Sequence, residues 1–135
     1  MMTITIDNNL QQLAILINKS LEYLEQNKIN QDVIQDIQLI IEEVVTNIIK
    51  YAYCQEQKQS IMITLKIDRD RIISTFEDYG KSFNPLQQIE DHDQFLATKQ
   101  DTIGGLGIFL VQELADYIKY IREDNKNILL VEKHY

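Results

Sequence analysis

The sequence has 135 residues, of which 44% are apolar, and its 13 basic and 21 acidic residues give a formal net charge of -8. An acidic chain without a basic run is poorly suited to a phosphate backbone, so direct binding to nucleic acid is not expected. The start lacks the basic-then-apolar pattern of a signal peptide, and no apolar run is long enough to span a membrane, so a cytoplasmic protein is predicted. Cys54 is the only cysteine, which excludes an internal disulfide. The length predicts a single domain, residues 1–135.

Two helices are predicted in the first part of the chain. Residues 3–6 alternate polar and apolar side chains as a short strand does, and Asp7-Asn8-Asn9 can cap a helix from Leu10 to about Gln26. The residues expected on its buried face are Leu10, Leu13, Ala14, Ile17, Leu21 and Leu24. Asn30 is expected to cap a second, longer helix. Its buried face is predicted to contain Val33, Ile34, Ile37, Ile40, Ile41, Val44, Val45, Ile48 and Ala52.

On the second helix Glu43 and Asn47 are four residues apart, so their side chains project from the same face. A carboxylate among apolar neighbours either reaches water or meets a polar group, because burying it alone is costly. Taken by itself, the pair is explained simply by a solvent-facing helix edge. The adjacent Glu42 points about 100° away around the helix, and we assign it to structure or solvent.

A hairpin is predicted next. Residues 61–67 alternate as a strand should, residues 68–71 form a charged turn, and a return strand covers residues 72–77. The period of two places Ile72, Ser74, Phe76 and Asp78 on one face, so Asp78 continues a core-facing row. A carboxylate there, followed by Gly80, can accept a hydrogen bond from an exocyclic amine such as that of adenine. An ordinary Asp-x-Gly turn is the alternative.

The stretch between Gly80 and Gly104 lacks a regular pattern, which is typical of a functional loop or lid. Within it Asp91-His92-Asp93 is interpreted as a solvated acidic turn and not as a metal site. Gly104-Gly105-Leu106-Gly107 leads into a third helix of mostly buried residues, 108–116. Glycines that open a helix offer free N–H groups and the positive end of its dipole to an anion, although a tight turn could also require them.

Two further strands are predicted at about 117–121 and 128–133, joined by a turn at 123–127. No repeat or Gly/Ser-rich linker marks a domain boundary. The predicted fold is an α/β two-layer sandwich, in which a mixed, mainly antiparallel sheet of about five strands carries three helices on one face.

Three of these segments together match a known pattern. Their order, Glu43-x-x-x-Asn47, Asp78-x-Gly80-x-x-Phe83-x-Pro85 and Gly104-Gly105-Leu106-Gly107-Ile108, resembles the N, G1 and G2 boxes of the GHKL ATPases, the superfamily of gyrase and the histidine kinases. Within it the sequence is most similar to the bacterial anti-sigma factor and serine-protein kinase family. The resemblance covers nearly the whole chain and implies a single histidine kinase-like ATPase domain with the Bergerat fold.

The resemblance implies a site for ATP and Mg2+. Asn47 would ligate the Mg2+ that bridges the phosphates, and Glu43 would be the general base that takes the proton from an attacking hydroxyl. Asp78 would bond the adenine amine, and Gly80 would permit that close contact. The segment Gly104-Gly105-Leu106-Gly107 would wrap the phosphates.

Some positions differ from the family pattern or stay open. Members often carry His four residues after the Asn, where this chain has Tyr51, and a second glycine near Ser82. Neither difference removes a proposed metal ligand or base. Contacts to the phosphates from three further residues are left open, namely Lys50, Lys99 and Thr102.

The function implied by the resemblance is that of an anti-sigma factor with serine/threonine-protein kinase activity. Such a protein binds a sigma factor or related target, phosphorylates a STAS-domain anti-anti-sigma protein, and is commonly a homodimer. The main rival function is that of an ATP-gated binding module of the same fold without phosphotransfer. An acidic interaction protein without nucleotide and a detached histidine kinase ATPase domain are weaker rivals. The detached domain is disfavoured because neither His92 nor His134 lies in a helix of the dimerisation type.

Overall fold

The computed structural model describes residues 1–51, 59–86 and 104–135. In chain order the elements are β1 (Met2–Asp7), α1 (Leu10–Gln26), α2 (Gln31–Tyr51), β2 (Ser60–Asp68), β3 (Arg71–Asp78), α5 (Gly104–Leu114), β4 (Tyr117–Glu123) and β5 (Lys126–His134). None of the described helices is both long and apolar enough to cross a membrane.

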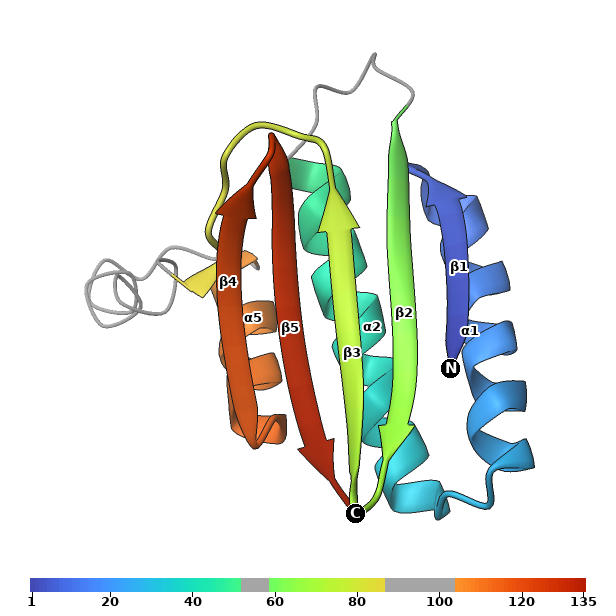
Figure 1. Cartoon of the computed structure of the whole chain (residues 1–135). Coiled ribbons are helices and arrows are strands. Elements are labelled where there is room, and N and C mark those ends of the chain that lie inside the picture. The colour runs from blue at the N-terminus through green and yellow to red at the C-terminus, as the bar shows by residue number, and fades with distance from the viewer. Residues whose placement is uncertain (52–58, 87–103) are drawn as a thin grey trace.

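The five strands form one sheet in the order β1-β2-β3-β5-β4, and its four strand pairings are antiparallel. Figure 1 shows α1, α2 and α5 side by side on one face of this sheet, with α2 in the middle. The predicted two-layer sandwich with three helices on one face is therefore confirmed. Both the C-terminal end of β3 and the β4–β5 turn lie at the same end of the molecule as the C-terminal end of α2 (Figure 1).

Two hairpin turns contain residues with a left-handed backbone. Asp124 and Asn125 have φ values of 53° and 63°, as the two-residue turn of a tight hairpin requires. Arg69, in the β2–β3 turn, has a φ of 57°. These turns fix the register of β2 with β3 and of β4 with β5. The pairing of β3 with β5, which no hairpin turn joins, places Asp78 opposite Asn127.

Both predicted helix caps are present. The Asn9 side chain accepts a hydrogen bond from the Gln12 backbone N–H at 3.0 Å, and the Asn30 side chain accepts one from the Val33 N–H at 3.0 Å. Each bond pairs a donor that the first turn of a helix would leave without an intrahelical partner. The sequence therefore sets where α1 and α2 begin.

The predicted buried face of α1 is partly wrong. Leu10 is 58% exposed and Ala14 is also exposed. The buried residues are Leu13, Leu16, Ser20 and Leu24. A serine can face the core here because its Oγ donates to the Leu16 carbonyl of its own helix at 2.8 Å.

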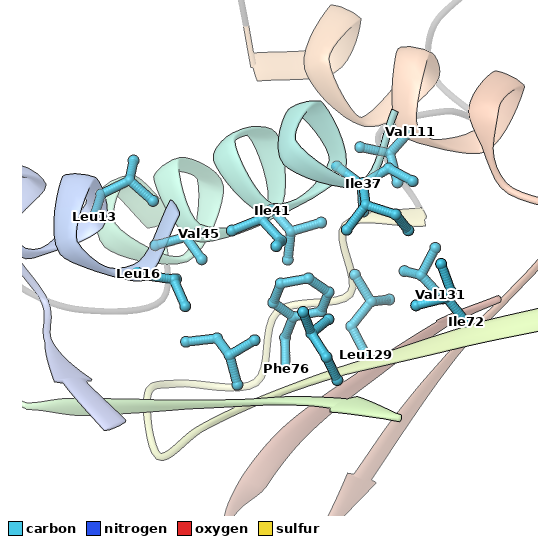
Figure 2. Packing of buried hydrophobic residues seen from close by; sticks show 14 of the residues in the cluster. Leu13, Leu16, Ile37, Ile41, Val45, Ile72, Phe76, Val111, Leu129 and Val131 are labelled. Carbon is cyan, nitrogen blue, oxygen red and sulfur yellow. The ribbon is translucent and has the colours of Figure 1, made fainter. Parts of the chain in front are cut away.

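The core lies between α2 and the sheet. Each apolar residue predicted on the buried face of α2 is buried, except Ala52, which lies outside the described residues. Figure 2 shows Ile37, Ile41 and Val45 of α2 directed toward Phe76 and Leu129 of the sheet. Burying side chains of this size stabilises the fold by about 1.5–3 kcal/mol each. The helix that carries Glu43 and Asn47 is thus the most firmly packed of the three.

The prediction that the third helix is mostly buried is wrong for two of its apolar residues. Ile108 and Val111 of α5 are buried, but Phe109 is 38% exposed and Leu110 is 37% exposed. Because α5 lies at the edge of the helix layer and packs against α2 on one side (Figure 1), its other side is left uncovered by the described elements.

Candidate functional site

A pocket lies where α2, β3 and β5 meet at one end of the molecule. It is lined by Val44, Asn47, Ile48, Phe76, Asp78, Phe83, Pro85, Ile108, Tyr120, Asn127 and Leu129. Two residues of the predicted nucleotide site, Asn47 and Asp78, are thus brought together. The free space is about 20 Å³, which is room for about one water molecule. A ligand as large as a purine base can enter only if part of the lining moves.

Asp78 is the last residue of β3 and faces the core, as the alternation of the strand predicts; it is 2% exposed. Its Oδ1 accepts hydrogen bonds from the Gly80 backbone N–H and from Asn127 Nδ2, both at 2.9 Å. Burial raises the pKa of the Asp78 carboxyl above its usual value of 3.8, whereas these two hydrogen bonds and the charge of Arg122 act to lower that pKa. Burial therefore disfavours the charged form of Asp78, while the Gly80 N–H and Asn127 Nδ2 hold the carboxylate in place.

Asn47 is 6% exposed, and its Nδ2 has no hydrogen-bond partner among the described residues. Leaving a buried donor unpaired costs about 1–3 kcal/mol. The neighbouring apolar residues of α2 dictate that the helix is buried, and the helical spacing carries Asn47 in with them. An oxygen of a bound ligand could accept a hydrogen bond from this amide, which makes Asn47 suited to ligand binding.

Glu43 and Gly107 meet where α5 packs against α2. A methyl group added to Gly107 would overlap the Glu43 carboxylate and lie 3.2 Å from its Cδ. No described glycine has a positive φ, so the small size of Gly107 matters here for the room it leaves to the Glu43 carboxylate and not for its backbone conformation. Glu43 is partly buried, whereas Glu42 is exposed, as expected.

The glycine-rich segment forms the first turn of α5, which begins at Gly104. The N–H groups of a helix's first turn have no intrahelical partner. In α5 they belong to Gly104, Gly105, Leu106 and Gly107. The first turn of α5 therefore offers N–H groups without intrahelical partners, and Gly107 of that turn lies against Glu43.

The described residues contain no group of three or more His, Cys, Asp or Glu side chains that could hold a metal ion. This donor set still fits Mg2+ that arrives with a nucleotide, because such Mg2+ takes most of its ligands from phosphates and water and one or two from the protein. The Oδ1 of Asn47 is suited to be one of those ligands.

Asn127 is a polar residue of the pocket that the sequence did not point to. It was placed at the end of the predicted turn 123–127, but it is the second residue of β5 and is 4% exposed. Its side chain bonds Asp78 directly. The signal that could have revealed it is strand pairing, because Asn127 lies opposite Asp78 in the sheet.

Two further residues of α2, Tyr51 and Lys50, lie near its C-terminal end. Tyr51, at the end of α2, stacks on Phe83 with ring centroids 5.5 Å apart and ring planes 22° apart. Lys50 is exposed. The predictions for Cys54, Asp91-His92-Asp93, Lys99 and Thr102 fall outside the described residues.

Comparison with known proteins agrees with the fold. A family model for the histidine kinase-like ATPase domain matches residues 6–133. The serine-protein kinase RsbW of Listeria monocytogenes is 27% identical over 104 residues, which make up 75% of this chain and 66% of that protein. The RsbW of Bacillus velezensis is 30% identical over 91 residues, covering 65% of this chain and 57% of that protein. This chain therefore spans two thirds or less of each of these relatives.

Two solved structures share the fold at low sequence identity. One is the histidine kinase domain of the blue-light activated histidine kinase from Erythrobacter litoralis EL346, with a TM-score of 0.55 and 14% identity over 90% of this chain and 60% of that chain. The other is the Acinetobacter baumannii histidine kinase AdeS, with a TM-score of 0.53 and 15% identity over 99% of this chain and 68% of that chain. Since the family model covers nearly the whole sequence, the chain belongs to the histidine kinase-like ATPase domain family.

Proposed function

We propose that this chain is an ATP-binding anti-sigma regulatory factor with serine/threonine-protein kinase activity. The observation that carries the proposal is the presence in one pocket of a buried carboxylate, Asp78, and a buried carboxamide, Asn47, whose Nδ2 lacks a described hydrogen-bond partner. Membership of an ATPase family and similarity to serine-protein kinases support it.

In this proposal Asp78 recognises the base. The two hydrogen bonds that it accepts within the described ranges both end on Oδ1, so we assign Oδ2 to the exocyclic amine of adenine. Gly80 lets the base approach the backbone closely. Entry of the base requires the small pocket to widen. The side chains that we expect to move are those of the lining residues outside regular strands and helices, Phe83 and Pro85.

The phosphates are assigned to the region between α2 and α5. We propose that Asn47 ligates Mg2+ through Oδ1 and that the first N–H groups of α5, from Gly104 to Gly107, bind phosphate oxygens. When bound, Mg2+ neutralises the phosphate charge and orients the transferring group.

Glu43 is proposed as the general base. Its carboxylate takes the proton of a serine or threonine hydroxyl as that oxygen bonds to the γ-phosphorus and the bond to the leaving ADP breaks. Its position beside the first turn of α5 supports this role, because Gly107 of that turn lies directly against it. Glu42, one residue earlier, is exposed and takes no part.

The partners that we propose are a sigma factor or related regulator, which this protein sequesters, and a STAS-domain anti-anti-sigma protein, which it phosphorylates. The added phosphate weakens binding of the antagonist because its charge must be desolvated in the interface. A single domain that works in the cytoplasm as a homodimer completes the proposal.

Phosphate transfer tests the activity. Wild type, Glu43→Ala and the matched control Glu42→Ala are each mixed with ATP labelled in the γ-phosphate and with STAS-domain proteins from the same genome. Label on one STAS-domain protein is expected with wild type and Glu42→Ala, and not with Glu43→Ala. If all three proteins bind ATP and none transfers label, the ATP-gated binding module without phosphotransfer replaces the kinase.

A further inference from the structure

We infer that Asn127 is a positioning residue of the nucleotide site, which holds Asp78 with one carboxylate oxygen turned to the base and fixes the turn that closes the pocket. The inference rests on the proposed ATP site. Asn127 belongs to none of the three sequence segments that suggested that site, and it reaches the pocket from β5, on the strand next to that of Asp78.

The orientation of the Asn127 amide is determined by its partners. Nδ2 donates to two acceptors, Asp78 Oδ1 at 2.9 Å and the Lys81 carbonyl oxygen at 2.8 Å. Oδ1 accepts from three donors, namely the Phe83 backbone N–H at 3.2 Å, Tyr120 Oη at 2.5 Å and Arg122 Nη1 at 3.2 Å. If the amide were turned by 180°, its NH2 group would face the three donors and its oxygen would face the two acceptors. The side chain is therefore held in one orientation.

This orientation decides how Asp78 is presented. The Gly80 N–H and Asn127 Nδ2 both bind Oδ1, so they fix the rotation of the carboxylate and leave Oδ2 to the ligand. A donor that is buried with a carboxylate also favours the ionised form, which is the form that accepts a hydrogen bond from an amine.

The same side chain orders the turn after β3. Residues 80–84 lie outside helices and strands, and side chains supply partners for part of their backbone. Asn127 bonds the backbone of Lys81 and of Phe83, and Arg122 Nη1 donates to the Gly80 carbonyl oxygen at 2.9 Å. Because Phe83 lines the pocket, Asn127 anchors the backbone of this apolar lining residue as well as the carboxylate of Asp78, and leaves the Phe83 side chain able to rotate.

The test compares ATP with purine riboside triphosphate, which lacks the exocyclic amine. Both nucleotides are titrated into wild type, Asn127→Asp and Asn127→Ala by calorimetry. The near-isosteric Asn127→Asp replaces the Nδ2 donor with an oxygen that faces Asp78 Oδ1 and the Lys81 carbonyl. Ser74→Ala is the matched control, because Ser74 is a buried polar residue of the same inner sheet face that does not line the pocket.

Wild type and Ser74→Ala are expected to prefer ATP by about tenfold or more, the value of a hydrogen bond to a charged group. Both Asn127 variants should lose most of this preference, with ATP binding weakened and binding of the amine-free analogue changed much less. Asn127→Ala carries the comparison should Asn127→Asp fail to fold, as judged by circular dichroism.

Two results overturn the inference while the ATP site stands. One is unchanged preference for ATP in the Asn127 variants, and the other is an equal loss of both nucleotides, which would mean that Asn127 supports only the fold. If wild type binds neither nucleotide, the ATP site itself is refuted and the inference falls with it.

Discussion

The substitution Gly107→Ala separates the catalytic assignment of Glu43 from the general role of a glycine-rich turn. The added Cβ would overlap Glu43 Oε2, the far end of a flexible side chain, and would lie 3.2 Å from Cδ. The carboxylate can yield by rotating away, so the two helices need not separate. We therefore expect a displaced base in an intact fold.

The magnitudes favour an effect on activity over one on stability. Alanine in a helix is about 1 kcal/mol more favourable than glycine, and this gain offsets part of the crowding, which typically costs about 1–3 kcal/mol. The free energy of unfolding should thus fall by no more than about 2 kcal/mol, which leaves a folded protein to assay. Displacing a general base by about 1 Å can reduce the rate about 100-fold, and losing its action altogether costs about 100- to 10,000-fold.

The assay is single-turnover transfer of phosphate from labelled ATP in a double-mutant cycle of Gly107→Ala and Glu43→Ala. Alone, each substitution should lower the transfer rate at least about 100-fold. Combined, they should be no slower than Glu43→Ala alone, because the displaced group is already gone. Binding of ATP with Mg2+ is measured in parallel and should stay near that of wild type in all variants.

Additive losses would refute this reasoning. If Gly107→Ala slows transfer or weakens ATP binding by the same factor with and without Glu43, the glycine acts on the phosphates and not through the carboxylate. Unchanged transfer in Gly107→Ala would equally contradict the assignment of Glu43 as the base.

Three further predictions concern the buried polar groups and the aromatic pair. Burial raises the pKa of Asp78 above 3.8, so the stability that the protonated Asp78 carboxyl contributes is full below about pH 3.8 and is lost as pH rises through the pKa of the folded state. The melting temperature of Asp78→Asn relative to wild type should therefore increase from about pH 4 to pH 7. A difference in melting temperature that stays constant with pH would contradict this. Ser74→Ala removes a fully buried hydroxyl that has no hydrogen-bond partner among the described residues, so the free energy of unfolding in urea should stay equal or rise by up to about 1 kcal/mol, whereas a loss above about 1 kcal/mol would reveal an undetected partner. The stacked rings of Tyr51 and Phe83 should show a coupling free energy of about 0.5–1.5 kcal/mol in a double-alanine cycle of thermal stability, and additive effects would show that the contact does not stabilise the fold.

Local periodicity was enough to predict most elements of the fold. The three-and-four spacing of apolar residues identified α2 and its buried face, and the period of two placed Asp78 in a core-facing row of β3. Where periodicity misled, packing decided the outcome. In α1, Ser20 lies in the core because its hydroxyl bonds the Leu16 carbonyl of the same helix, whereas Ala14 is exposed. One side of α5 is exposed because this helix lies at the edge of the helix layer.

The site was predictable only in its local parts. The spacing of Glu43 and Asn47 follows from the helix, but the burial of Asn47 beside Asp78 depends on how α2 packs on the sheet. The contact between Glu43 and Gly107 and the bond from Asn127 to Asp78 join segments far apart in the sequence. No local pattern encodes such contacts, since they depend on helix packing and on β5 pairing with β3.

Calorimetric titration of ATP with Mg2+ into wild type, Asn47→Ala and Glu43→Ala tests the central claim most directly. We expect wild type to bind, Asn47→Ala to lose the Mg2+-dependent part of the affinity, and Glu43→Ala to bind like wild type because a general base acts on the transfer step. Absence of binding by wild type would contradict the nucleotide site, and a Mg2+-dependent affinity left intact in Asn47→Ala would contradict the assignment of its metal ligand.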